Sequence, residues 1–154
     1  MNELFGKYMS IIHRQKHKFV CRALEHYGLG FSEYLFLLYI SKQEGCTQNA
    51  LCQILMIDAA LATRSMRKLE KQNLIERRSI PNDQRAYALW LTSEGRAIIP
   101  DLIQALDQWW DTLLGDFSPE QKTLLLSQLE IMAKKAAALT TDLSHSNSKT
   151  EESE

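Results

Sequence analysis

The 154-residue sequence has little of what marks secreted or membrane proteins. Its three cysteines are an odd number without the spacing of a disulfide framework, which fits a reducing compartment. The longest uninterrupted apolar run, Tyr34 to Ile40, is far too short to cross a bilayer. Met1-Asn2-Glu3 has no basic start and no apolar run follows it, so no signal peptide is visible. We therefore expect a cytoplasmic protein that does not enter a membrane.

The sequence also lacks the residue combinations on which enzymes depend. It has no paired carboxylates, no Ser-His-Asp set, no phosphate-cradling glycine loop and no cluster of zinc ligands. His13 and His17 stand four residues apart and could share a metal ion, but two histidines without a third ligand make a weak site. A solvated basic helix face explains them better. The expectation is no catalytic residue, no metal and no cofactor.

Charge is nearly balanced over the whole chain but unevenly distributed. The formal net charge is −1, and the hydrophobic and charged fractions, 45% and 24%, are ordinary for a globular protein of one domain. Between Arg64 and Arg85 stand seven basic and three acidic residues, a local charge of +4. From Thr140 onward four acidic residues and one lysine give −3. A concentrated basic segment is the electrostatic footprint expected of a nucleic-acid-binding surface.

The basic segment begins in a predicted helix, residues 58–72, with two different faces. Asp58 is a good N-cap because its carboxylate can accept from the free amides of the first turn. One set of residues at helical spacing should pack inward: Ala62, Met66, Leu69 and Asn73. The opposite face carries Ala60, Arg64, Arg67 and Lys71. Such a helix is suited to lie against phosphate, although surface pairs of Glu70 with Arg67 and of Glu76 with Arg77 are the alternative.

The neighbouring segments complete a pattern. Thr47 to Leu55 predicts a short helix capped by Thr47, separated from Asp58 by two residues only, as in a helix-turn-helix. Residues 74–79 and 86–91 predict two strands, and residues 80–85 between them are rich in turn formers. Helix, turn, helix and then a hairpin is the order of a winged helix.

Longer helices flank this pattern. We expect helices over Glu3–Tyr27 and over Glu33–Gln43, the second with Ser32 as N-cap. A further helix follows Thr92 as N-cap, with a kink or a loosened turn at Pro100, and the last one follows a Ser118–Gln121 capping box. The helix after Thr92 has two adjoining apolar stripes, more than a small winged-helix core can cover. This surplus argues for a twofold homodimer, unless Trp109 and Trp110 only complete an intramolecular core.

On these motifs the chain resembles the MarR family of bacterial transcription regulators. The match is carried by four features: the Thr47-Gln48 start, the helix from Asp58 to Leu69, the Pro81-to-Ala86 wing and the Leu91-Thr92-x-x-Gly95 exit. It covers roughly residues 4–139. The resemblance implies a mainly α fold with one domain over 1–139, in which a winged-helix lobe at about 31–95 is joined to dimerisation helices at about 3–27 and 96–139. An acidic tail, 140–154, is expected to be disordered.

The function that the resemblance implies is sequence-specific binding of double-stranded DNA. The protein would be a homodimeric repressor on a pseudo-palindromic operator, released by a small phenolic or other aromatic effector. Helix 58–72 would enter the major groove and wing 80–86 the minor groove. The candidate DNA-contacting residues are Thr47, Gln48, Ala60, Thr63, Arg64, Arg67, Lys71, Asp83 and Arg85.

The chemistry of these side chains suggests a division of roles. Arg64 and Arg67 can present a bidentate fork to guanine, whereas Lys71 is placed for phosphate. The segment Thr47-Gln48 starts a helix, where free amides meet phosphate. Arg85 would enter the minor groove and Asp83 would hold the wing by pairing with an arginine. The apolar positions Ala59, Ala60 and Leu61 can contact thymine methyl groups, which predicts a T-rich preference near the start of the helix.

The effector and the sensing chemistry stay open at this level. Tyr34, Tyr39 and Trp109 are candidates for lining a pocket between the second helix, the helix after Thr92 and the DNA-binding lobe, although aromatic residues at helical spacing are more often core. Cys21, Cys46 and Cys52 leave a redox-responsive regulator as an alternative, with Cys46 expected to be the most exposed. A metal-responsive regulator of the same fold is a further hypothesis, and so is a winged-helix protein-interaction module. Such a module would need neither a cationic helix face nor a wing arginine.

Overall fold

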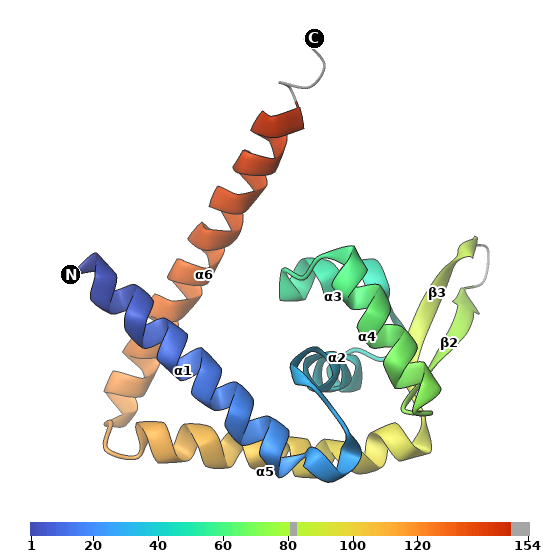
Figure 1. Cartoon of the computed structure of the whole chain (residues 1–154), viewed down its shortest axis with the longest axis horizontal. Coiled ribbons are helices and arrows are strands. Elements are labelled where there is room, and N and C mark those ends of the chain that lie inside the picture. Colours follow the sequence, from blue (N-terminus) through green and yellow to red (C-terminus); the bar gives the residue numbers. More distant parts are fainter. Residues whose placement is uncertain (81–82, 149–154) are drawn as a thin grey trace. The chain divides into compact units, whose positions relative to one another are not determined.

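The chain is mostly helical, with one small sheet (Figure 1). The computed structural model describes residues 1–80 and 83–148; for 83–86 and 140–148 it describes the backbone alone. The elements in chain order are α1 (Asn2–Ala23), a 3₁₀ helix η1 (Glu25–Tyr27), α2 (Phe31–Lys42), β1 (Cys46–Thr47), α3 (Gln48–Leu55), α4 (Ala59–Lys71), β2 (Ile75–Ile80), β3 (Asp83–Leu91), α5 (Ser93–Leu114) and α6 (Pro119–Ser148).

These elements form two compact units. The first, Met1–Thr112, holds everything from α1 to nearly the end of α5, and the second, Leu113–Glu154, consists mainly of α6. The expected winged helix lies wholly within the first unit. Within the described residues, no helix combines the length and the apolar character needed to span a bilayer.

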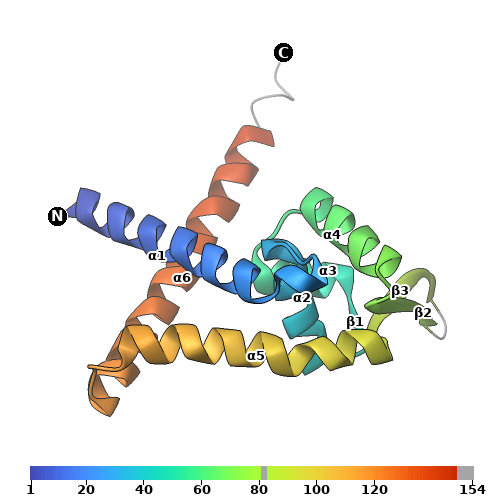
Figure 2. The same ribbon diagram turned by 60° about the horizontal axis from the view of Figure 1, so that its bottom comes forward.

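The core of the first unit is built around α2, as its nearly uniform apolar sequence predicts. Both views show α2 enclosed by the other elements of this unit (Figures 1 and 2). Four of its side chains are completely buried: Tyr34, Phe36, Leu37 and Ile40. Residues from α1, α3, α4, the sheet and α5 pack around them, among them Val20, Leu51, Met66, Leu89 and Leu102. The elements of the winged helix therefore rest on a common apolar support.

The sheet has three antiparallel strands in the order β1-β3-β2. The two predicted strands are confirmed, although β3 begins at Asp83, inside the segment predicted as a turn. β1 is too short to have been predicted. Ile75 pairs with Leu91 and Arg77 with Leu89, so these residues face the core, while Glu76 and Trp90, also paired, face outward. Arg77 thus shares the inner face of the sheet with buried leucines.

The boundaries of the first two helices differ from the prediction. The helix expected to reach Tyr27 ends at Ala23, because the chain turns at Leu24. The Leu24 side chain is buried. The Tyr27 hydroxyl donates to Asp101 at 2.6 Å. Ser32 is not the N-cap of α2. The helix begins after Gly30, whose backbone N–H donates to the Glu33 carboxylate at 2.8 Å. A glutamate at the third helical position reaches back to supply the cap.

The last two helices begin where the sequence predicts, and α6 extends beyond its predicted end. The Ser118–Gln121 capping box is confirmed, with Ser118 N 2.8 Å from Gln121 Oε1 and Gln121 N 3.3 Å from Ser118 Oγ. Pro100 lies inside α5 without ending it. The backbone of α6 continues to Ser148, into the segment expected to be disordered. No glycine or proline follows Pro119, so nothing in the sequence stops this helix; residues 149–154 lie outside the described part.

Candidate nucleic-acid interface

The recognition helix α4 is formed by local interactions that the sequence predicts. The Asp58 carboxylate accepts from the backbone N–H of Leu61 at 2.8 Å, which confirms Asp58 as the N-cap. Met56, with φ 52°, makes the left-handed turn that separates α3 from α4. An N-cap of this kind stabilises a helix by about 1 kcal/mol. The helix-turn-helix therefore rests on two caps, Thr47 and Asp58, and the turn between them.

One face of α4 packs on the core. Ala62, Met66 and Leu69 are completely buried, as predicted. Asn73 was wrongly assigned to this face: α4 ends at Lys71, and Asn73 is exposed in a left-handed conformation with φ 56°. Ser65, only 2% exposed, lies on the inward face of α4 instead. The inward stripe is thus shorter than the sequence pattern indicates, because the helix ends before Asn73.

The opposite face of α4 carries three exposed cations. Ala60, Arg64, Arg67 and Lys71 are all exposed. Within the part of the chain whose side chains are described, Arg64, Arg67 and Lys71 make no ion pair. Three further basic residues of the same segment are paired: Lys68 with Glu33, Arg77 with Glu70 and Arg78 with Glu76. The local positive charge is therefore concentrated on one side of α4.

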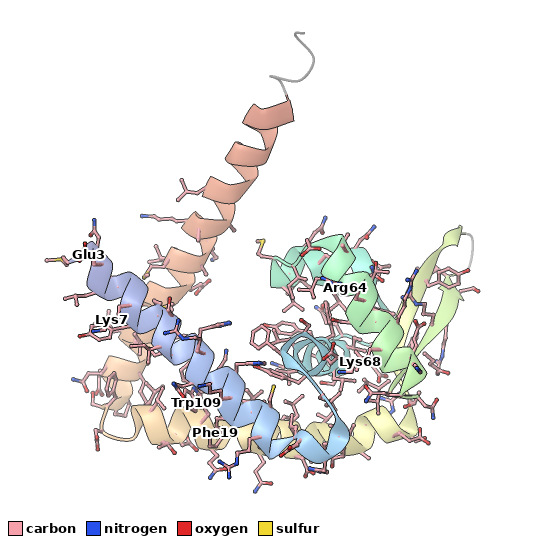
Figure 3. The ribbon with its side chains drawn as sticks, in the orientation of Figure 1. Glu3, Lys7, Phe19, Arg64, Lys68 and Trp109 are labelled. Atoms are coloured by element: carbon pink, nitrogen blue, oxygen red, sulfur yellow. The ribbon has the colours of Figure 1, made fainter. Side chains whose placement is uncertain are left out.

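The alternative interpretation of this helix as an ordinary salt-bridged face predicted different pairs. Glu70 binds Arg77 at 2.7 Å rather than Arg67, and Glu76 binds Arg78 rather than Arg77. Neither glutamate neutralises the outer face of α4. Figure 3 shows Arg64 in the N-terminal half of the helix and Lys68 one turn later, where its ammonium lies 3.3 Å from the Glu33 carboxylate of α2.

The side chains at the start of α3 are engaged within the protein. Thr47 accepts from the backbone N–H of Ala50 at 3.2 Å, which confirms it as the N-cap. The Gln48 amide nitrogen donates to the Thr63 hydroxyl at 3.0 Å, and its oxygen accepts from Arg77 at 3.3 Å. Thr63 is half-buried, and its hydroxyl lies 2.8 Å from the Ala59 carbonyl oxygen. The phosphate contacts expected of Thr47 and Gln48 stay predictions, with the backbone amides of this turn as further donors.

The wing is a two-stranded hairpin whose tip carries the remaining candidates. Ile80 pairs with Asp83, after an irregularity in the register at Ser79. The side chains of Asp83 and Arg85 lie outside the described part of the structure, so their expected roles stay predictions. Trp90 lies on the outward face of the sheet. Its ring packs against the Arg78 guanidinium, which lies 4.5 Å from the ring centroid.

The three aromatic candidates for an effector pocket differ in burial and in their immediate neighbours. Tyr34 is completely buried in the core beside Phe31, and burial raises the pKa of its phenol. Tyr39 is half-buried, with the Lys42 ammonium 5.6 Å from its ring, and stands about 140° round the helix from Tyr34. Trp109 packs on Phe19 of α1 with ring centroids 5.5 Å apart (Figure 3). A common pocket lined by these three side chains stays a prediction.

His13 and His17 of α1 and the three cysteines pack against other side chains. His13 and His17 both meet the ring of Phe31 edge to face, at 5.0 and 5.4 Å between centroids. Cys21 lies 3.4 Å from His17 Nδ1. Cys46 is half-buried rather than exposed, and so are Cys21 and Cys52. All three thiols pack against the core.

Two residues that matter for this surface were missed at the level of sequence. Arg77 was counted as a basic residue or as a surface partner of Glu76, although its alternation with Ile75 along the strand places it on the inner face. Glu33 was assigned to the first turn of a helix, but it both caps Gly30 and holds Lys68. The partner of Glu33 lies 35 positions away in the sequence, so no local pattern could have predicted this pair.

Comparison with known proteins agrees with this geometry. Residues 27–86 match the model of the MarR family. The HTH-type transcriptional regulator BilQ of Clostridioides difficile strain CD3 is 30% identical over 111 residues, which are 72% of this chain and 75% of the relative. The crystal structure of a MarR transcriptional regulator from Methanosarcina mazei Go1 superposes with a TM-score of 0.80 at 27% identity, over 89% of this chain and 99% of that one.

A second solved structure shares the fold at lower identity. It is a MarR family transcriptional regulator from Listeria monocytogenes complexed with a 26mer DNA, with a TM-score of 0.83 at 23% identity, over 86% of this chain and 88% of that one. The family consists of transcriptional regulators and not of enzymes. The helix-turn-helix, the wing and these relatives together show that the chain belongs to the MarR family of transcriptional regulators, with a DNA-binding winged helix.

Proposed function

We propose that this protein is a homodimeric repressor that binds a pseudo-palindromic operator, with α4 in the major groove and the β2–β3 wing in the minor groove. One observation carries the proposal: Arg64, Arg67 and Lys71 are exposed on one face of α4, while the basic residues beside them are paired internally. Cations held at a surface without partners can replace the counterions of DNA phosphates. The Listeria relative of the same fold, solved with DNA, supports the assignment.

The same face supports a division between base and phosphate contacts. Arg64 stands near the middle of α4 and can reach guanine O6 and N7 through two parallel hydrogen bonds. Lys71 stands at the C-terminal end, where a point charge favours phosphate. Exposed Ala60, one turn before Arg64, offers a methyl group, which supports the expected preference for thymine near the start of the helix. Arg85 completes the proposal from the wing.

Dimerisation is supported by apolar side chains that the fold leaves exposed. On α1 these include Leu4, Phe5, Tyr8 and Met9, which are between 47% and 57% exposed. On α6, Leu124, Leu126 and Leu139 are more than 60% exposed. Monomeric proteins rarely leave so many large apolar side chains in water on two helices. A twofold dimer built on these helices would place two recognition helices on half-sites about one helical turn apart.

Release by a small aromatic or phenolic effector is the regulatory part of the proposal. Two buried polar groups support it, since the Tyr34 hydroxyl and the Trp109 indole nitrogen have no hydrogen-bond partner among the described residues. A ligand can release DNA only if it binds one spacing of the recognition helices better than the other. Tyr34, Tyr39 and Trp109 remain the proposed lining. A cytoplasmic location follows from the proposed function, because the operator lies there.

A redox-responsive regulator is less well supported. Burial is the main cause that raises the pKa of all three thiols, and the Glu33 carboxylate adds to the effect at Cys21. Because the thiolate is the reactive form, each cysteine is less nucleophilic at neutral pH than a free one. A metal-responsive regulator has no better basis, since no group of three or more His, Cys, Asp and Glu among the described residues could hold an ion.

The thiols are therefore expected to react slowly with iodoacetamide at neutral pH. Their raised pKa moves the onset of alkylation to higher pH than for glutathione, and unfolding in urea should abolish this difference. Mass spectrometry of the labelled protein measures the rate at each cysteine. DNA affinity should be unchanged after mild peroxide treatment. A cysteine that is labelled rapidly and whose labelling releases DNA would support the redox alternative.

The proposed function is tested by selecting bound duplexes from a random pool at about 0.1–0.15 M salt, where non-specific phosphate binding is weaker. An enriched inverted repeat with half-sites about one turn apart is the expected result. No enrichment by a folded, dimeric protein, even after extensive dialysis to remove a bound effector, would favour a winged-helix interaction module. Light scattering on the same sample measures the oligomeric state independently.

A further inference from the structure

A chain of hydrogen bonds joins the wing to the recognition helix through α3. Arg77 of β2 donates from Nε to Glu70 Oε1 at 2.7 Å and from Nη2 to Gln48 Oε1 at 3.3 Å. Gln48, the first residue of α3, donates from Nε2 to Thr63 Oγ1 at 3.0 Å. Thr63 in turn lies 2.8 Å from the Ala59 carbonyl oxygen in α4. One arginine thus links three elements that all belong to the proposed DNA-binding surface.

The chemistry of the groups allows only one direction of donation along this chain. A guanidinium has no acceptor, so the Gln48 oxygen must face Arg77 and the Gln48 amide nitrogen must face Thr63. A backbone carbonyl has no proton to give, so the Thr63 hydroxyl proton goes to Ala59. The Thr63 oxygen is then free to accept from Gln48. Each donor finds an acceptor, and the orientation of the Gln48 amide is decided by Arg77.

Arg77 is less exposed than the arginine that follows it in β2. It lies on the inner face of the sheet opposite Leu89, and its side chain is 29% exposed, against 52% for the outward-facing Arg78. Its charge is met by Glu70, which is itself only 32% exposed. An arginine held by a fork to a carboxylate and an amide is ordered more firmly than one at a free surface.

We propose that Arg77 is a positioning residue for sequence recognition, which acts through Gln48 on Thr63 and makes no contact with DNA itself. The inference rests on the proposed DNA-binding function. With its proton given to Ala59, the Thr63 hydroxyl has no donor left for a base, so Thr63 presents a methyl group and at most one lone pair. Loss of Arg77 frees the Gln48 amide to rotate and frees the Thr63 hydroxyl to reorient. Base pairs that were rejected for lack of a donor then become acceptable.

The test compares selection and salt dependence for four proteins: wild type, Arg77→Ala, Arg77→Lys and the matched control Arg78→Ala. Each is put through the random-pool selection and then titrated on the wild-type site and on an unrelated duplex at several salt concentrations. Arg77→Ala should lower the ratio of specific to non-specific affinity roughly tenfold and broaden the preference at one or two base pairs of each half-site. The slope of log affinity against log salt should not change, because no phosphate contact is lost.

Arg77→Lys separates positioning from charge. Lysine keeps the positive charge but has no fork to reach Glu70 and Gln48 together, so it should show the same broadened preference as alanine. Arg78→Ala should keep the wild-type preference. If Arg77→Lys restores specificity, or if the salt slope falls by about one in Arg77→Ala, then Arg77 contacts phosphate and the proposal is wrong.

Two further variants keep the test decisive if Arg77→Ala proves unstable. Gln48→Ala interrupts the same chain farther from the sheet and should broaden the same base pairs without changing the salt slope. Thr63→Val removes the hydroxyl that would donate, so it should not broaden them. An unchanged preference in Gln48→Ala, or the same broadening in Thr63→Val, would overturn the proposal. If the proposed function is wrong, the wild-type protein itself will select no site, which distinguishes that outcome from failure of this inference alone. The inference would then be wrong as well.

Discussion

Gly95→Ala is expected to lower the free energy of unfolding by about 3 kcal/mol, because there is no room for a methyl group at this position. A Cβ built on Gly95 would lie 2.0 Å from the Leu74 carbonyl oxygen and 3.0 Å from the Leu74 carbonyl carbon. Backbone atoms cannot rotate away as a side chain can. The Leu74 carbonyl oxygen is also held by the backbone N–H of Thr92 at 3.2 Å. Urea unfolding followed by circular dichroism measures the loss.

Gly6→Ala is the matched control, since Gly6 also lies inside a helix but has no atom within 4 Å of its would-be Cβ. Here alanine should raise stability by about 0.5–1 kcal/mol, because it is the better helix former. If glycine-to-alanine lowers the free energy of unfolding at Gly95 and raises it at Gly6, the effect at Gly95 comes from close packing and not from helix propensity. Equal stability of the two variants would contradict the close approach of Gly95 to the backbone of Leu74.

Arg64→Ala is expected to weaken binding to the selected operator by about 1–3 kcal/mol while changing binding to an unrelated duplex little. The exposed guanidinium has no ion pair among the described side chains, so its removal leaves no buried charge behind and should not destabilise the fold. Fluorescence anisotropy with both duplexes measures the two affinities. The specificity should relax at the base pair that Arg64 contacts.

Two substitutions serve as comparisons for Arg64→Ala. Lys71→Ala should weaken binding to both duplexes by a similar factor and lower the salt slope by about one, as expected for a phosphate contact. Arg14→Ala removes an exposed arginine from α1 and should leave both affinities unchanged. If Arg64→Ala and Lys71→Ala behave alike on the two duplexes, the assignment of base and phosphate contacts to these residues is wrong.

The sequence by itself determined the helix-turn-helix and most helix starts. Thr47, Asp58, Thr92 and Ser118 were predicted as N-caps, and each accepts from a backbone N–H three residues ahead. A cap needs nothing beyond the first turn of its own helix, so local sequence is sufficient. The hairpin followed in the same way from strand patterns and turn formers. The exception is Ser32, which was predicted as the N-cap of α2. Gly30 takes that position instead, because the Glu33 carboxylate accepts from the Gly30 backbone N–H.

Only the tertiary structure decided which basic residues are available. Charge counting treats Arg64, Lys68 and Arg77 alike, but Lys68 meets Glu33 from another helix and Arg77 turns inward to Glu70. These partners are 35 and seven positions away in the sequence, and whether they meet depends on how α2, α4 and β2 pack on the common core. Local patterns fix secondary structure because its interactions span a few residues, whereas the pairing of charges is decided by contacts between elements that the chain brings together only on folding.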